Sequence, residues 1–448
     1  MMEKNQIVTV PRRVLSSLLS SLAAGVVPRA GAPYVAIGRK DEIGAFLSDL
    51  ENIGEGGSSM RFLIGRYGSG KSFLMQLIRG YALERDFLTA DADLTPERRL
   101  YGSGGSGVAT YRELIKNLAS KASPDGGALP KIIARWIGHL QSQIDGEDPT
   151  GVKLRDAVMQ DLRDVEFLVG GFDFARVIAA YYRAYLEGED EQMSACLCWL
   201  RGEFASKTEA RRALGFSVSL IIDDDNWYDF IKLFGVLARR IGYRGLVIFI
   251  DECVNLYKIV HRVSRENNYE KILSMFNDAL QGKAEGLLMV LGGTPQFLED
   301  PRRGLFGYEA LRSRLCDSRF NDAEFRNLIG PVIRLRRLSD DELFALIVRV
   351  TALYAQYYHW VPRITAEQQV RFLTLALSRA GGNSMMTPRE LLRDYLTVLN
   401  ILMQNENADF ERIVASVTAE SRPAGESDGE SGATGSKNGN FSPEDIIL

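Results

Sequence analysis

Hydrophobic and polar positions follow a helical spacing at the start of the chain. Apolar residues recur every three or four positions in residues 10–22, and Gly25 and Pro28 end this pattern. A second amphipathic pattern begins after Gly38 and continues to the glycine pair at residues 56–57. The N-terminal part of the chain is therefore predicted to be two helices that lead into the core.

Short runs of apolar, β-forming residues come next and predict core strands. These runs occupy residues 60–64, 86–94, 245–250, 286–291 and 332–335. Segments of helical periodicity separate them, and an alternation of strands and helices implies a parallel sheet. The predicted fold class is therefore α/β, with a parallel sheet flanked by helices.

Two longer regions have only helical periodicity. Residues 129–213 predict a helical insert within the sheet-forming part, and helices after residue 335 predict a C-terminal lid that ends near residue 417. In residues 421–440, nine of twenty residues are Gly or Ser, which predicts a disordered tether. The apolar residues at 441–448 are interpreted as a docking peptide, with a frayed end as the alternative.

The expected organisation has six parts. They are N-terminal helices (1–57), a first core part (58–128), a helical insert (129–215), a second core part (216–335), a helical lid (336–418) and a tail (419–448).

Composition and charge indicate a globular protein. Hydrophobic residues make up 46% and charged residues 25% of the 448 residues, and the net charge is −4. An acidic balance excludes a strongly basic nucleic-acid-binding domain but leaves a local basic groove open. The four cysteines do not form a disulfide framework, and no uninterrupted apolar run approaches a membrane span. A cytoplasmic protein without a membrane partner is expected.

A phosphate-binding loop is the clearest motif in the sequence. Residues 65–72 match the pattern Gly-x-x-x-x-Gly-Lys-Ser between a predicted strand and a predicted helix. Its glycines let backbone amides surround a phosphate, Lys71 reaches the β- and γ-phosphates, and Ser72 ligates Mg²⁺. The alternative is an ordinary glycine turn. The phosphate contacts are expected from Gly65, Gly68, Ser69, Gly70, Lys71 and Ser72.

Polar residues end two of the later predicted strands. Asp251 and Glu252 follow an apolar strand, as in a Walker B pair, with Asp251 for Mg²⁺ and Glu252 for the attacking water. A helix cap is the alternative for this pair. Thr294 ends the next strand as a sensor of the γ-phosphate, or as a turn hydroxyl before Pro295.

Several arginines are candidates for neutralising phosphate charge. Four lie close together in the sequence: Arg302, Arg303, Arg312 and Arg314. One of these would act as an arginine finger, and the alternative is a solvated basic surface. Arg389, at the start of a predicted lid helix, would approach the phosphates from another side or lie on the surface. The three histidines have no partners at metal-ligand spacing, so no zinc site is expected.

Together these features resemble an AAA+ ATPase of the replication-initiator or STAND-like kind. Longer segments, over about residues 25–399, look like the BrxD ATP-binding proteins of BREX-type phage defence. The segments are GVVPRAGAPYVAIGRKDEI, DADLTPERRLYGSGG, LRGEFASKTEARRALG, IIDDDNWYDF, IDECVNLYK, LGGTPQFLEDPRRGLFGYEALRSRL and TPRELL.

The resemblance implies a set of roles and a biological setting. It implies ATP and Mg²⁺ as ligands, Thr294 as the sensor, Arg312 or Arg314 as a finger acting across subunits, and Arg39 and Arg389 flanking the nucleotide. It also implies antiviral defence beside helicase or methylase partners.

Two classes of function stay open. The first is an ATP-hydrolysing switch or motor that forms homo-oligomers and binds DNA. The second is a nucleotide-gated scaffold with little turnover. A helicase acting alone lacks support because the sequence has no second core with its own phosphate loop. DNA contacts would come from the basic clusters at residues 98–99 and 334–337.

Overall fold

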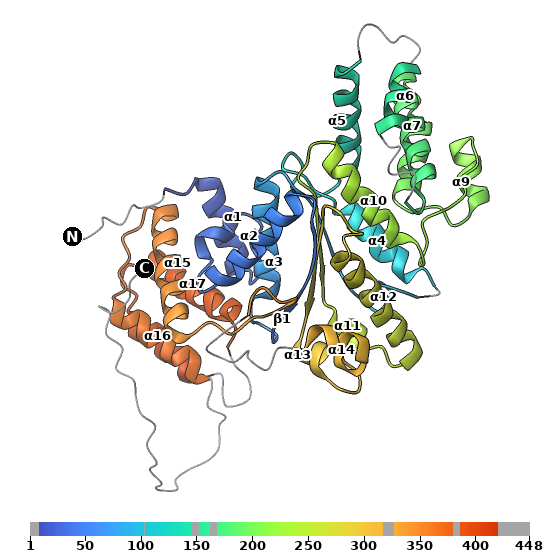
Figure 1. Cartoon of the computed structure of the whole chain (residues 1–448). Helices are drawn as coiled ribbons and strands as arrows, with labels where there is room; N and C mark the ends of the chain where they lie inside the picture. Colours follow the sequence, from blue (N-terminus) through green and yellow to red (C-terminus); the bar gives the residue numbers. More distant parts are fainter. Residues whose placement is uncertain are drawn as a thin grey trace. The chain divides into compact units, whose positions relative to one another are not determined.

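The structure is a computed structural model in which two compact units are distinguished (Figure 1). The residues described are 9–102, 104–144, 152–161, 168–316, 327–379 and 386–419. Unit 2 spans Arg39–Arg336, and unit 1 combines the residues before Arg39 with those after Arg336. The predicted tail, apart from residue 419, lies outside the described residues.

A five-stranded parallel sheet forms the centre of unit 2. The strands are β1 (Ser58–Ile64), β2 (Leu88–Asp93), β3 (Leu246–Asp251), β4 (Leu287–Gly293) and β5 (Val332–Arg334). Their order across the sheet is β2-β3-β4-β1-β5, and every neighbouring pair is parallel. The predicted α/β class is confirmed, and each of the five predicted strands forms with bounds shifted by no more than two residues.

Helices cover both faces of this sheet, which explains why its central strands β3 and β4 are mainly apolar. All residues of β3 and β4 are buried. In Figure 1 one group of helices lies on one face of the sheet and a second group lies on the other face. The first group is α2 (Lys40–Gly54) and α3 (Lys71–Glu84), and the second is α4 (Ser106–Lys116), α10 (Trp227–Arg240) and α12 (Arg262–Leu280).

In its described residues, the segment predicted as an insert forms helices that are joined by turns and short loops. Its helices are α5 (Leu129–Ser142), α6 (Val152–Asp161), α7 (Gly171–Glu187), α8 (Asp190–Leu200) and α9 (Lys207–Leu214). Edge-to-face aromatic contacts join α7 and α8 to α10, with ring centroids 5.3 Å apart for Phe174–Phe234 and 5.5 Å for Trp199–Phe230. Figure 1 shows α5, α6 and α7 beyond the end of the sheet opposite α13 and α14.

Short helices follow the carboxyl ends of β3 and β4. They are α11 (Val254–Tyr257), α13 (Pro295–Glu299), η2 (Leu305–Gly307) and α14 (Glu309–Leu315). Since parallel strands all end at the same edge, these segments gather where the phosphate-binding loop also begins. The chemistry of unit 2 is therefore concentrated at this edge.

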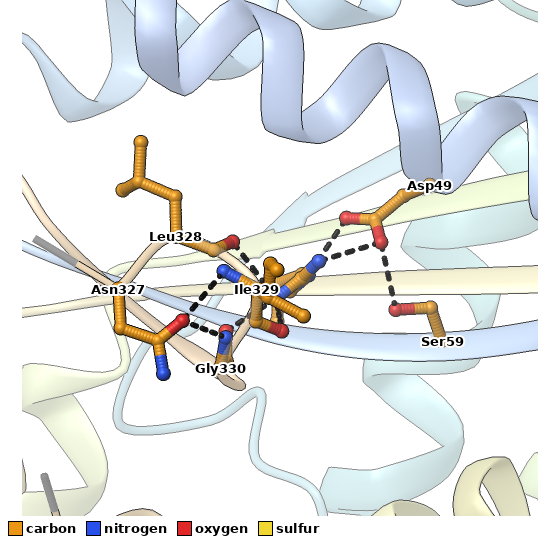
Figure 2. Close-up of polar contacts among 7 residues, drawn as sticks. Asp49, Ser59, Asn327, Leu328, Ile329 and Gly330 are labelled. Atoms are coloured by element: carbon orange, nitrogen blue, oxygen red, sulfur yellow. Dashed lines mark hydrogen bonds and ion pairs between the residues drawn. The ribbon is translucent and has the colours of Figure 1, made fainter. Parts of the chain in front are cut away.

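A buried ion pair fixes the edge strand β5 to the rest of the sheet (Figure 2). Arg61 on β1 donates two hydrogen bonds of 2.7 Å to the carboxylate of Asp49 on α2, and both side chains are buried. The same guanidinium donates to the carbonyls of Leu328, Ile329 and Gly330, just before β5. An arginine inside an apolar strand is thus explained by the backbone that it holds.

Unit 1 contains helices from both ends of the chain. They are α1 (Arg12–Ala23), η1 (Ala32–Val35), α15 (Asp340–Tyr358), α16 (Ala366–Arg379), α17 (Pro388–Gln404) and α18 (Phe410–Ala419). The first helix packs on α15 and α17, so it belongs with the C-terminal helices, whereas α2 belongs to the unit of the sheet. No helix in the described ranges is long and apolar enough to cross a membrane.

Candidate functional site

The phosphate-binding loop connects the buried strand β1 to α3. Gly68 and Gly70 have φ values of 76° and 90°, which residues other than glycine rarely adopt. A Cβ atom at Gly65 would lie 2.3 Å from the Oγ atom of Ser69, so a side chain here would displace the Ser69 hydroxyl. The backbone conformation therefore depends on Gly68 and Gly70, and Gly65 leaves room for the Ser69 side chain.

Backbone amides at the end of this loop are available to an anion. In the part of the chain that the structure describes, the amides of Gly70, Lys71 and Ser72 have no hydrogen-bond acceptor. The first amides of a helix lack partners within it, and the helix dipole places partial positive charge there. The start of α3 can thus accept a phosphate group.

Lys71 lies over the loop and donates to its carbonyls. Its Nζ atom is 3.0 Å from the carbonyl oxygen of Gly65 and 3.4 Å from that of Arg66. Desolvation lowers the pKa of Lys71, and the charges of Asp251 and Glu252 partly oppose this shift. The lysine therefore carries a poorly solvated charge beside the loop, which a phosphate would stabilise.

Ser72 and Asp251 are brought together although they are 179 residues apart. The Oγ atom of Ser72 donates a hydrogen bond of 2.7 Å to Oδ2 of Asp251, and Asp251 is only 9% exposed. Gly292 on β4 leaves space for this carboxylate, because a Cβ atom there would lie 2.3 Å from Oδ1 of Asp251. A hydroxyl beside a carboxylate fits Mg²⁺, which prefers oxygen ligands and keeps several waters.

Glu252 has a different environment from its neighbour. Its side chain is exposed, its φ is 56°, and its amide donates 2.8 Å to Oδ1 of Asp251. A positive φ in a residue with a side chain is strained and is common at functional sites. The two adjacent carboxylates are therefore separated into one buried group and one group that faces solvent.

Asp93 is a third carboxylate at this edge, and the sequence analysis missed it. It ends β2 and pairs in register with Asp251 on β3. Desolvation raises the pKa of Asp93, and the charges of Asp251 and Glu252 raise it further. The sequence contains one signal for it, a carboxylate at the end of the second strand, but its proximity to Asp251 depends on the strand order.

The hydroxyl of Thr294 makes a local hydrogen bond at the turn before Pro295. Thr294 is the N-cap of α13, and its Oγ1 atom accepts a hydrogen bond of 3.3 Å from the amide of Phe297. Because β4 lies between β1 and β3, the residue still follows the strand next to both motifs. A sensor role for Thr294 stays a prediction.

The two arginines expected to flank a nucleotide lie in different units. Arg39 is buried in unit 2, and its Nη2 atom donates to the carbonyl of Ser69 at 2.8 Å and to that of Arg336 at 2.9 Å. Arg389 lies in the first turn of α17 in unit 1. A contact between either guanidinium and a nucleotide stays a prediction.

The arginine cluster separates into structural and exposed members. Arg303 donates to the carbonyls of Tyr257 and Ile259 and stacks on the Tyr257 ring, so it has a structural role. Arg312 and Arg314 are exposed on α14. Arg314 donates to Asn277 and Ala310, whereas Arg312 makes no side-chain hydrogen bond or ion pair with the described residues. Arg312 is the better placed of the two to reach another molecule.

These observations define the class of protein. A glycine loop between β1 and a helix, a serine beside the carboxylate that ends β3, and a five-stranded parallel sheet are together typical of P-loop nucleotide-binding proteins.

Comparison with known families then identifies the family. A family model described as "BREX system ATP-binding protein BrxC/D" matches residues 10–418, so the chain belongs to this family of ATP-binding proteins. The resemblance found in the sequence is thereby confirmed. A search of curated proteins finds no match.

Proposed function

We propose that this protein hydrolyses ATP with Mg²⁺ and acts as a nucleotide-driven switch or motor in BREX phage defence. The family supports ATP binding and the BREX setting. The observation that carries hydrolysis is the pair of carboxylates that ends β3, one bonded to Ser72 at 2.7 Å and the other exposed beside it. A protein that only binds ATP would not need the second carboxylate.

Each residue of the site has a distinct task in this proposal. The loop amides and Lys71 hold the phosphates, while Ser72 and Asp251 hold Mg²⁺, which neutralises charge that develops on the phosphates. The exposed carboxylate of Glu252 accepts a hydrogen bond from the attacking water and orients it towards the γ-phosphate. Catalysis thus depends mainly on positioning and charge.

The test uses two variants that are expected to differ in ATP binding. Lys71→Ala removes a phosphate contact and is expected to abolish ATP binding. Glu252→Gln keeps the size of the side chain and is expected to retain ATP binding while losing turnover, since the amide is a poor acceptor for the water proton. Binding is measured with a fluorescent ATP analogue and turnover by phosphate release.

The outcome also separates the proposal from a nucleotide-gated scaffold. Unchanged turnover in Glu252→Gln contradicts the role of Glu252. Tight ATP binding by the unmodified protein, with no phosphate release in the presence or absence of DNA, supports the scaffold instead.

Assembly and partners extend the proposal. We infer a homo-oligomer in which an arginine of α14 reaches the nucleotide of a neighbouring subunit, with DNA and a defence helicase or methylase as partners. The exposure of Arg312 supports the first of these, and the others rest on the family resemblance.

A further inference from the structure

Arg39 is buried and makes several contacts within the protein. It is the N-cap residue of α2 and is 4% exposed. A single nitrogen, Nη2, donates to the carbonyls of Ser69 and Arg336, and Nη1 lies 3.8 Å from the carboxylate of Glu42. A charged donor to a buried carbonyl makes a strong hydrogen bond.

The bond to Ser69 controls the direction of the next amide. In a planar trans peptide, the carbonyl of Ser69 and the N–H of Gly70 point in opposite directions. When Arg39 holds the carbonyl on its own side, the Gly70 amide points away from Arg39. This amide has no acceptor within the described residues and is one of the expected phosphate donors.

The bond to Arg336 involves the boundary of the unit. Unit 2 begins at Arg39 and ends at Arg336. The chain therefore passes from unit 1 into unit 2 just before Arg39 and returns to unit 1 just after Arg336. One guanidinium therefore joins the phosphate-binding loop to both points where the chain enters and leaves unit 2.

The hydrogen bond from Arg39 to Ser69 becomes more important for the loop when Lys71 binds a phosphate. The described side chains that donate to loop carbonyls are Arg39 and Lys71. A lysine that reaches a phosphate gives up its bonds to Gly65 and Arg66. Arg39 is then the side chain that still holds the loop backbone.

We propose that Arg39 is a positioning residue that orients the Ser69–Gly70 peptide for phosphate binding and couples the loop to the two inter-unit connections. This inference rests on the proposed ATP binding. It adds which side chain holds the loop and which segments respond when the loop binds a phosphate. Arg39 need not touch the nucleotide to have this effect.

The first measurement is steady-state kinetics of the full chain. Arg39→Gln is expected to raise the KM for ATP about tenfold, within the 5–150-fold range typical of site coupling, and to leave kcat nearly unchanged. KM is expected to rise without a change in kcat because a misdirected Gly70 amide weakens the binding of substrate and transition state equally. Arg39→Lys, which keeps one charged donor, is expected to recover part of the loss.

The control is Arg265→Gln. Arg265 is also a buried arginine that donates to a backbone carbonyl, that of Ile259 at 2.7 Å, and this carbonyl lies outside the phosphate-binding loop. It is expected to leave KM unchanged. A general effect of losing a buried arginine would raise KM in the control as well and would overturn the inference.

The second measurement is hydrogen exchange with and without a non-hydrolysable ATP analogue at saturation. In the unmodified protein, the analogue is expected to protect amides of the loop and of residues 37–40 and 335–339. In Arg39→Gln, or in Arg39→Lys if the first does not fold, protection of the loop is expected to remain and that of the connections to fall.

The outcomes separate this inference from the proposed function. If the analogue protects the loop but not the connections in the unmodified protein, the role of Arg39 is overturned and ATP binding is not. The same holds if the connections stay fully protected in the variant. Absence of any loop protection in the unmodified protein overturns ATP binding and, with it, this inference.

Discussion

At the scale of single residues, a missing side chain leaves the space that the carboxylate of Asp251 occupies. Gly292 faces Asp251, and a Cβ atom there would lie 2.3 Å from Oδ1 of Asp251 and 2.7 Å from Cε of Met75. Both distances are shorter than any normal contact. The glycine on β4 therefore belongs to the site although it carries no functional group.

Gly292→Ala is expected to displace Asp251 from Ser72. Overpacking of this kind costs about 1–3 kcal/mol of unfolding free energy. The displaced carboxylate should raise the Mg²⁺ concentration needed for half-maximal turnover, which a Mg²⁺ titration measures beside urea denaturation.

A matched glycine gives the control for this substitution. Gly44 lies in α2, and a Cβ atom there would have no neighbour within 4 Å. Gly44→Ala is expected to stabilise the helix by about 0.5–1 kcal/mol and leave the Mg²⁺ titration unchanged. An unchanged titration in Gly292→Ala would contradict the role of this close contact.

Residue patterns also show how far the sequence predicts the site. The loop residues 65–72 are contiguous, so their spacing alone indicates the phosphate cradle. Asp93 and the bond from Arg39 to Ser69 could not be predicted in this way, because they join segments that are distant in the sequence. Thr294 shows a third case: the residue was identified with two alternatives, a sensor and a turn hydroxyl, and the structure shows its hydroxyl capping α13.

At the scale of elements, β5 depends on the Arg61–Asp49 pair. Arg61 binds Asp49 and the carbonyls that precede β5, and both charged groups are buried. Removing one partner leaves the other charge unpaired in a poorly solvated place. Arg61→Ala or Asp49→Ala is therefore expected to cost about 3–5 kcal/mol of unfolding free energy.

A double-mutant cycle measured by urea denaturation tests this expectation. The double variant should cost less than the sum of the two single changes, because neither charge is then left unpaired. Arg262→Ala breaks an exposed pair with Glu266 on α12 and should leave the unfolding midpoint unchanged. Additive losses in the cycle would show that the two side chains act independently.

At the scale of the whole molecule, a finger that acts across subunits makes turnover depend on assembly. ATPase activity is expected to rise more than linearly with protein concentration. Arg312→Ala should lower turnover at high concentration by roughly 10³-fold while retaining ATP binding, because such a finger stabilises charge in the transition state. Arg262→Ala is the matched exposed control.

The concentration series is measured beside sedimentation. A strictly linear dependence in a protein that sediments as a monomer would contradict a trans-acting Arg312.

The proposed DNA binding would also depend on the assembled surface, and two of the arginines expected to contact DNA form ion pairs within the chain. Arg98 forms an ion pair with Glu113 at 3.1 Å, and Arg334 pairs with Glu299. Binding is therefore expected to be weak, independent of sequence and steeply reduced by salt. Titrations at two salt concentrations measure this, and tight binding that ignores salt would contradict the electrostatic basis.

What the sequence alone determined was local. The period of the apolar residues located the strands, and the glycine spacing located the loop, because each depends on residues that are neighbours in the chain. The tertiary structure alone decided three pairings: α1 with the C-terminal helices, Asp93 with Asp251, and Arg39 with both Ser69 and Arg336. These pairings follow from the strand order and the helix packing, which bring distant segments together and leave no periodic signal along the chain.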